Sequence, residues 1–386
     1  MDYHFDDPID RTHTDCIKWD TAEPGVLPMW IADMDFKAAP AIQQTLEKRV
    51  AHGIFGYTHT PQRFYDAIIG WWNKRHGFAP HPDWLIPVTG VVPALSVIIR
   101  ALTDPGDKVL LQPPVYNHFF ASIVHCDRQA VQNNLRLHNG VYEFDYEDLD
   151  AKASDPAVKL LLLSNPHNPV GRVWTTEELL RIGEICLRHN VVVVSDEIHS
   201  DLVYDPHRHI PFASLGHDYA LRSITVSSPT KTFNIAGLQA AYLFSENAAF
   251  REQVRHILDM QEMTLLNPFA IEALVAAYEQ GEHWLESLKT YLAANFTYLT
   301  DFCRSLLPQI QVIPLQATYL VWLDGRSVIP SSADFADKLL REQRLWLSPG
   351  TLYGDAGEGF LRLNIACPRP LLEEGLVRLS QAWSDS

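Results

Sequence analysis

The sequence predicts an α/β fold in which a mostly parallel central sheet forms a large domain and a smaller α+β domain completes the chain. The middle of the chain alternates short apolar runs with helical patterns, which is typical of βαβ units. With 386 residues, 47% of them hydrophobic, the chain is long enough to bury two cores. We expect an N-terminal arm with part of the small domain at residues 1–44, the large domain at 45–280 and the C-terminal small domain at 281–386.

Four apolar runs are candidates for strands of the central sheet. Lys108 to Gln112 ends at two prolines, and Val158 to Ser164 ends in a loop too rich in proline to be helical. The third run places four consecutive valines before Asp196, which indicates a strand that is buried on both faces. Ser223 to Ser227 is the next strand, and it leads to Lys231.

A helix is expected between the second and third of these strands. Thr175 and Glu178 have the spacing of a capping box, and the helix should run from there to about His189. Beyond residue 280 the pattern changes to a long amphipathic stretch, followed by alternating segments at 317–323 and 360–365. These later segments predict the smaller α+β domain.

The charge and cysteine content exclude several classes of partner and compartment. The net charge is −16 and no run of Lys or Arg occurs, so we expect neither nucleic acid nor a membrane surface as a partner. Five widely spaced cysteines without a CxxC pair, and a start that lacks an apolar signal segment, predict a cytoplasmic protein. His207 and His209 lack the neighbouring ligands of a metal site, and we predict none.

Polar side chains follow the ends of three of the predicted strands. Asn168, Asp196 and Lys231 each come after one, and ligands of open α/β sheets bind beyond such ends. A lysine amine can form a Schiff base with an aldehyde cofactor, and a buried aspartate can keep a pyridine nitrogen protonated. These three residues therefore predict a site for pyridoxal 5′-phosphate (PLP), placed in the large domain.

The sequence also offers a place for the cofactor's phosphate. Gly90, Val91 and Val92 precede a helical pattern that runs from Pro93 to Leu102. Backbone N–H groups at the start of a helix bind phosphate well, because they have no partner within the helix. We expect these three residues to contribute to the cofactor site.

Longer motifs give the chain a resemblance to a known family. The runs 165–171, 195–199 and 231–237, with a late arginine at Arg362, resemble fold-type I PLP-dependent enzymes of the aminotransferase superfamily. Further segments resemble its cystathionine β-lyase, or C–S lyase, subgroup of the MalY/PatB type. These are Ile9-Asp10-Arg11 with Lys18-Trp19-Asp20, the run Met29 to Phe36, and Asp196 to His199 with His209 to Phe212.

The resemblance implies a role for several residues around the cofactor. Lys231 would carry the Schiff base, Asp196 would bind the pyridine nitrogen and Asn168 the phenolic oxygen of the ring. Tyr116 would stack on the ring, and Tyr57 would reach the phosphate in a neighbouring subunit, which predicts a homodimer.

The resemblance also covers the phosphate and the substrate. Ser228 would add its hydroxyl to the phosphate site, and Arg362 would bind the substrate carboxylate through two parallel donors. Asn168 would contribute to substrate binding as well as to the cofactor. Two positions depart from the aminotransferase pattern. His199 stands where many members have a tyrosine, and Gln239 where many have an arginine on the phosphate.

Together these observations predict an enzyme with Lys231, Asp196 and Tyr116 as its catalytic residues. The resemblance implies a PLP-dependent carbon–sulfur β-lyase that converts L-cystathionine or a related cysteine S-conjugate to a thiol, pyruvate and ammonia. An aminotransferase would use almost all of the same residues and is the first alternative. A PLP-binding regulatory or interaction protein is the second, although no DNA-binding module accompanies the core.

Overall fold

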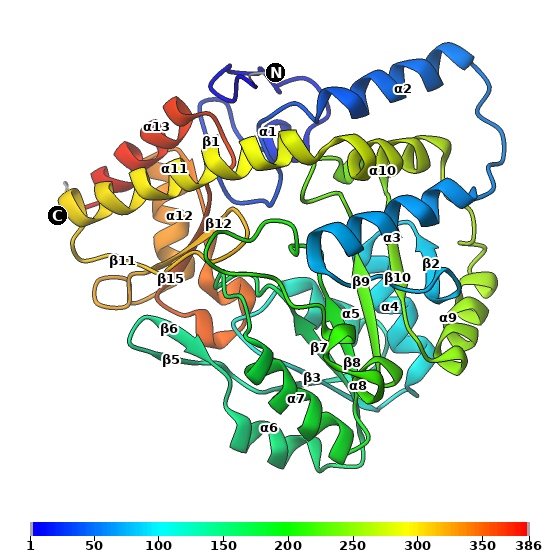
Figure 1. Cartoon of the computed structure of the whole chain (residues 1–386). Helices are drawn as coiled ribbons and strands as arrows, with labels where there is room; N and C mark the ends of the chain where they lie inside the picture. The colour runs from blue at the N-terminus through cyan, green and yellow to red at the C-terminus, as the bar shows by residue number, and fades with distance from the viewer. Residues whose placement is uncertain (1–2, 384–386) are drawn as a thin grey trace.

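A seven-stranded sheet forms the centre of the computed structural model, which describes residues 3–383 (Figure 1). In spatial order its strands are β2 (Leu85–Val88), β10 (Ala241–Phe244), β9 (Ser223–Ser227), β8 (Val192–Asp196), β7 (Val158–Ser164), β3 (Lys108–Leu111) and β4 (Gln129–Gln132). Strand β10 is antiparallel to both of its neighbours, and every other neighbouring pair is parallel. The prediction of a mostly parallel sheet is confirmed.

Helices cover both faces of this sheet. One face carries α4 (Val91–Leu102), α5 (Asn117–Val124) and α9 (Ala248–Met260), and the other carries α6 (Tyr146–Ala153), α7 (Thr176–Arg188) and α8 (His217–Leu221). Strand β7 shows why its sequence is apolar throughout. Leu160 and Leu162 pack into the core beneath α4, α5 and α9, whereas Leu161 and Leu163 pack into the core beneath α6, α7 and α8. Successive side chains of a strand point to opposite faces of the sheet.

The predicted capping box at the start of α7 is present. The Thr175 hydroxyl accepts a hydrogen bond from the Glu178 N–H at 3.2 Å, and the Glu178 carboxylate accepts one from the Thr175 N–H at 2.8 Å. These bonds satisfy two donors that the helix itself leaves without a partner. The expected strands at 158–164 and 223–227 have the predicted bounds, and the one at Lys108 ends at Leu111, one residue early.

The C-terminal part of the chain builds a second, antiparallel sheet. Its strands, in spatial order, are β11 (Gln311–Val312), β12 (Leu320–Asp324), β15 (Phe360–Asn364) and β14 (Ser348–Pro349). Three helices accompany it, namely α11 (Glu282–Leu306), α12 (Ser332–Glu342) and α13 (Arg369–Gln381). The long amphipathic stretch predicted after residue 280 is the helix α11, drawn in yellow in Figure 1.

The N-terminal arm lies beside this second sheet (Figure 1), and its residue Ala32 also contacts Lys231, beyond the end of β9. It contains α1 (Ile17–Asp20) and β1 (Leu27–Pro28), and β1 pairs in parallel with β13 (Leu345–Trp346) near the other end of the chain. After the arm come α2 (Pro40–His52) and α3 (Gln62–His76), and both contact α10 (Pro268–Gln280). The expected boundary at residues 44 and 45 falls inside α2.

The remaining elements are short. A hairpin of β5 (Arg136–His138) and β6 (Val141–Glu143) stands apart from the large sheet. Single 3₁₀ turns occur at Pro82–Trp84, Phe212–Leu215, Ala236–Leu238, Gly350–Tyr353 and Asp355–Gly357. Within residues 3–383, no helix is both long and apolar enough to span a membrane.

Candidate active site

A cavity of about 210 Å³ lies at the carboxyl ends of the parallel strands. Eight of the predicted site residues line it, together with residues that the sequence did not single out. The predicted ones are Gly90, Val91, Val92, Tyr116, Asn168, Asp196, His199 and Lys231. Residues as far apart in the sequence as 90 and 231 therefore meet at one place, as the crossover connections of a parallel sheet allow.

Asp196 is the last residue of β8, and its carboxylate is buried at the cavity. The only hydrogen bond to this carboxylate in the described structure comes from the Ile198 N–H, at 3.2 Å. Burial raises the pKa of Asp196 to about 7, and the nearby Lys231 lowers it only in part. Because the charged carboxylate is poorly solvated here, a cationic N–H donor in the cavity would stabilise it.

Lys231 lies four residues beyond the end of β9, and its amine reaches the cavity. The amine donates a hydrogen bond to the carbonyl oxygen of Ala32 at 2.8 Å. Burial lowers the pKa of Lys231 to about 8, against the opposing charge of Asp33. A much larger fraction of this amine is therefore neutral near pH 7 than of an ordinary lysine, and only the neutral amine can act as a base or nucleophile.

Asn168 lines the cavity, and Arg362, which comes from the other sheet, does not line it but contacts Asn168. Asn168 follows β7, and its side-chain oxygen accepts a hydrogen bond from Nη1 of Arg362 at 3.2 Å. Arg362 stands in the middle of β15, and its Nη2 donates to the Trp30 carbonyl at 2.7 Å. Its Nε is buried without a hydrogen-bond partner in the described structure, so this guanidinium keeps a donor for a ligand.

The first turn of α4 faces the same cavity. Gly90 precedes the helix and no side chain caps it, so the N–H groups of Val91 and Val92 have no helical partner. The side chains of Thr89, Thr230 and Gln239 line this cavity as well. Free N–H groups beside hydroxyls are what a phosphate group requires.

Two rings complete the lining. His199 is buried with Nδ1 unpartnered in the described structure, and burial lowers the pKa of this histidine to about 3. Tyr116 precedes α5, and burial, helped by the charge of Asp196, raises the pKa of its phenol to about 12. Both groups are therefore neutral near pH 7, so they act as hydrogen-bond partners or stacking surfaces and not as charges.

Besides Arg362, two further predicted residues do not line the cavity. Ser228 is buried, its hydroxyl donates to the Ala240 carbonyl at 2.6 Å, and it accepts from the Thr230 N–H at 3.0 Å. Tyr57 lies between α2 and α3 and is 100% exposed. Within one chain, the structure thus brings neither residue to the cavity.

Several residues of the lining had no place in the sequence analysis. Thr89 and Thr230 each flank a predicted site residue, so a search for hydroxyl groups beside Gly90 and Lys231 would have found them. Ala32 contributes only its main-chain carbonyl, which every residue has, so its residue type could not have indicated this contact. His209, which we set aside as a metal ligand, binds the buried Glu197 at 2.6 Å through Nε2.

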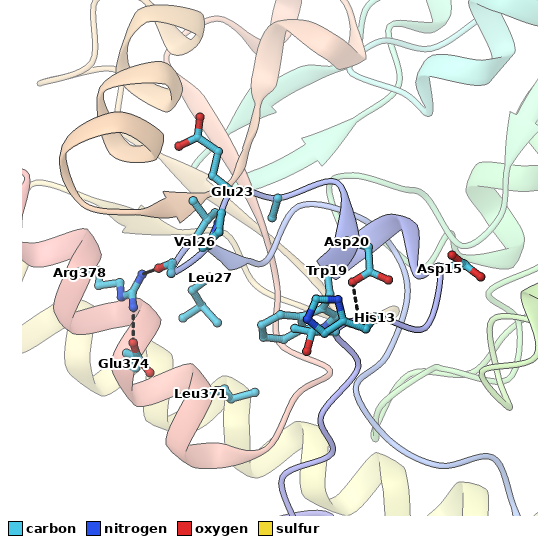
Figure 2. A pocket seen from close by; sticks show the side chains of 14 residues that line it. His13, Asp15, Trp19, Asp20, Glu23, Val26, Leu27, Leu371, Glu374 and Arg378 are labelled. Carbon is cyan, nitrogen blue, oxygen red and sulfur yellow. Dashed lines mark hydrogen bonds and ion pairs between the residues drawn. The ribbon is translucent and has the colours of Figure 1, made fainter.

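A larger cavity, of about 760 Å³, lies elsewhere, between the N-terminal arm and α13 (Figure 2). Trp19, Val26 and Leu371 line it, and none of the predicted site residues does. In Figure 2 the Asp20 carboxylate is turned to His13, from whose N–H it accepts a hydrogen bond at 2.7 Å. Size alone therefore does not mark the place where the reactive groups gather.

The smaller cavity suits PLP at three points, namely the pyridine nitrogen, the ring oxygen and the phosphate. The buried carboxylate of Asp196 lacks a cationic partner in contact, and a protonated pyridine nitrogen would supply one. The unpartnered Nδ1 of His199 and the free donors at the start of α4 suit the ring oxygen and the phosphate.

Comparison with known proteins gives full-length matches. The profile of the family "Aminotransferase class I and II" matches residues 31–379. Cystathionine beta-lyase PatB of Bacillus subtilis is 44% identical over 99% of this chain and 100% of its own length. Cystalysin from Treponema denticola, whose crystal structure contains pyridoxal 5′-phosphate, is 32% identical and covers 100% of both chains with a TM-score of 0.97. The PLP-bound C–S lyase from Staphylococcus hominis is 33% identical over 98% of both chains, with a TM-score of 0.92.

Proposed function

The chain belongs to the class I and II aminotransferase family, and from this premise we propose that it is a PLP-dependent carbon–sulfur β-lyase. Its substrate is L-cystathionine or a related cysteine S-conjugate, and its products are a thiol, pyruvate and ammonia. The observation that carries the proposal is the meeting of Lys231, Asp196 and Asn168 at one cavity. Full-length similarity to a cystathionine beta-lyase favours elimination over transamination.

The residues that line the cavity would hold PLP in one orientation. Asp196 would bind the pyridine nitrogen, and Asn168 and His199 the ring oxygen. The Asn168 side-chain oxygen already accepts from Arg362, so its NH₂ group remains to donate. The start of α4 would hold the phosphate, and Tyr116 would lie against the ring.

When bound, PLP supplies an electron sink for the charge that develops at the substrate Cα. Lys231 removes the Cα proton as general base, because the lowered pKa of its amine, about 8, leaves part of it unprotonated near neutral pH. Asp196 would keep a proton on the ring nitrogen, because a cation beside a buried carboxylate favours its charged form.

Arg362 fixes the substrate for this step. Its guanidinium would bind the substrate carboxylate, so that Cα lies within reach of Lys231. As the C–S bond breaks, the sulfur leaves with the bonding electrons, and Lys231 or a water molecule returns a proton to it. One water molecule is consumed when the remaining three-carbon unit becomes pyruvate and ammonia, which balances the reaction.

We also propose a cytoplasmic homodimer in which Tyr57 contributes to the neighbouring subunit's phosphate site. The loop that carries Tyr57 exposes Ile54 and Phe55, at 67% and 53%, and an exposed apolar patch suits an interface. All five cysteines are free thiols, which suits a reducing compartment. We retain 1–44, 45–280 and 281–386 as the proposed division into arm, large domain and small domain.

The proposed function is tested by mixing the PLP-loaded protein with L-cystathionine in the absence of any 2-oxo acid. Pyruvate and free thiol are measured together over many turnovers. Equal, catalytic amounts of both support β-elimination. If no pyruvate forms, and an amino group is transferred once a 2-oxo acid is added, the protein is an aminotransferase and the proposal is wrong.

A further inference from the structure

The sequence motifs of the N-terminal arm come together in one buried charge cluster. We call Arg11, Lys18, Trp19 and Asp35 the Asp35 cluster. Lys18 and Asp35 are 1% and 4% exposed, and the Lys18 amine lies 2.6 Å from Asp35 Oδ2. Arg11 Nη1 and Trp19 Nε1 both donate to Asp35 Oδ1 at 2.8 Å. Both carboxylate oxygens of Asp35 therefore accept hydrogen bonds from this cluster. The proposed mechanism gives the cluster no role.

The Asp35 cluster holds residues 30–36, which we call the arm segment. This segment has neither helical nor strand structure, so its backbone depends on side-chain partners for its shape. Arg11 binds the Asp33 carboxylate at 2.7 Å and donates to the Met34 carbonyl at 2.8 Å. Lys18 donates to the Asp33 carbonyl at 3.0 Å. The cluster therefore fixes the segment at three consecutive residues.

The other side of the arm segment contacts the reactive groups. The Ala32 carbonyl accepts from the Lys231 amine at 2.8 Å and from the Tyr319 hydroxyl at 3.2 Å. The Trp30 carbonyl accepts from Nη2 of Arg362 at 2.7 Å. Two main-chain oxygens of one irregular segment thus contact both the proposed base and the proposed carboxylate-binding residue.

The turn before α1 explains how the cluster forms. The Asp20 carboxylate accepts hydrogen bonds from the N–H groups of His13, Thr14 and Cys16 at 2.7, 3.0 and 2.9 Å. Figure 2 shows Trp19 and Asp20 side by side at the end of α1, next to this turn. Asp20 closes the turn, and the adjacent Lys18 and Trp19 can then both reach Asp35.

We propose that Arg11, Lys18 and Asp35 are positioning residues of the active site. They fix the arm segment so that the Ala32 carbonyl orients the Lys231 amine for proton transfer at Cα and the Trp30 carbonyl orients Arg362. The inference rests on the proposed function in one respect, namely that Lys231 takes the Cα proton. A cluster that merely anchors the arm would affect stability and leave the chemistry of the folded protein unchanged.

The test follows proton transfer without any leaving group. The PLP-loaded protein is incubated with L-alanine in D₂O, and exchange of the Cα proton is followed by NMR, per folded and PLP-loaded molecule. Asp35→Asn should slow this exchange about tenfold or more, because small misplacements of a reacting group are costly. Trp19→Phe, which removes one donor and leaves no charge unpaired, should slow it by about two- to fivefold.

A second readout does not involve activity. Amide hydrogen exchange, measured by mass spectrometry on peptides that cover 30–36, should be faster in both variants than in the native protein. Glu23→Gln is the matched control. It also removes a carboxylate charge from the arm, where Glu23 pairs with Arg344 at 2.6 Å, but it does not contact the arm segment. In this control, the rate of Cα proton exchange and the rate of amide exchange in residues 30–36 should both equal those of the native protein.

The outcomes separate this inference from the proposed function. If Lys231→Ala retains Cα exchange, the proposed base is wrong. If Lys231→Ala abolishes exchange while folded Asp35→Asn and Trp19→Phe keep the native rate, only the positioning role is wrong. If Asp35→Asn does not fold, two other variants test the positioning role. These are Trp19→Phe and the charge-balanced double variant Lys18→Met with Asp35→Asn, and a native rate of Cα exchange in both would show that the positioning role is wrong.

Discussion

The two sides of the cavity are built in different ways. On one side, Asp196 ends β8 and Lys231 follows β9, so two fully buried parallel strands place them. On the other side, the arm segment, residues 30–36, has no regular structure and presents main-chain carbonyls. The sheet side supplies the groups that we propose to react. The arm side supplies acceptors that orient them, and its own geometry depends on the Asp35 cluster.

From this difference we expect substitutions on the sheet side to abolish function abruptly and substitutions on the arm side to reduce it by degrees. A side chain on the sheet side has a chemical role that no neighbour can replace. The arm side acts through several hydrogen bonds at once, so removal of one leaves the others in place. Variants on the two sides should therefore differ in size of effect, and the following experiments test that ordering.

The largest effect is expected for Lys231→Ala. Loss of the general base should lower turnover of L-cystathionine by at least about 10³-fold, since such groups typically contribute 10²–10⁴-fold. Pyruvate and thiol release measure it, and PLP retained after gel filtration is followed by absorbance. The cofactor should still be held in part through the start of α4. Lys159→Ala, on an exposed position of β7, is the control. Native-like turnover in Lys231→Ala would contradict the mechanism.

Asp196→Asn should cause the second largest loss of activity. The amide cannot stabilise a protonated ring nitrogen as a carboxylate does, so kcat should fall by about 10²–10³-fold. Steady-state kinetics on the fully loaded protein measure this effect. Asp155→Asn, at a surface ion pair with Lys108, should have no effect on kcat. Equal losses in both variants would show that a general loss of charge, and not the ring contact, is responsible.

Arg362→Lys tests the residue that joins the two sides. Lysine lacks the planar fork that binds Asn168, Trp30 and a carboxylate together. Loss of one charge-assisted hydrogen bond is worth roughly 2 kcal/mol, so kcat/KM should fall about 30-fold. Arg326→Lys is the matched control, because Arg326 binds Asp324 next to the same sheet, away from the cavity. An unchanged kcat/KM in Arg362→Lys would exclude a role in carboxylate binding.

His199→Gln should have the smallest effect on the sheet side. Burial lowers the pKa of His199 to about 3, so the imidazole is neutral throughout the range of pH in which the protein is assayed. Glutamine can replace one neutral hydrogen bond, and kcat should change by less than about fivefold. The pH profile of kcat should keep its shape. A shifted limb between pH 5 and 8 would mean that His199 ionises during the reaction.

The residues on the sheet side of the site could be predicted from the sequence alone. Strands such as 158–164 and 192–196 are local apolar patterns, and the polar residue at the end of each can be read directly from the chain. The topology of parallel sheets then brings those ends together, so Asn168, Asp196 and Lys231 could be placed at one cavity in advance. The resemblance of the arm motifs to one lyase subgroup was likewise visible in sequence.

The contacts of those arm motifs, in contrast, could not be predicted from the sequence. Asp35 binds Arg11 and Lys18, which precede it by 24 and 17 residues, and no periodicity encodes such contacts. Ala32 contributes a carbonyl, which every residue has, so its meeting with Lys231, 199 positions away, is invisible in the sequence. Local patterns specify regular elements, whereas contacts made by irregular backbone depend on how those elements pack.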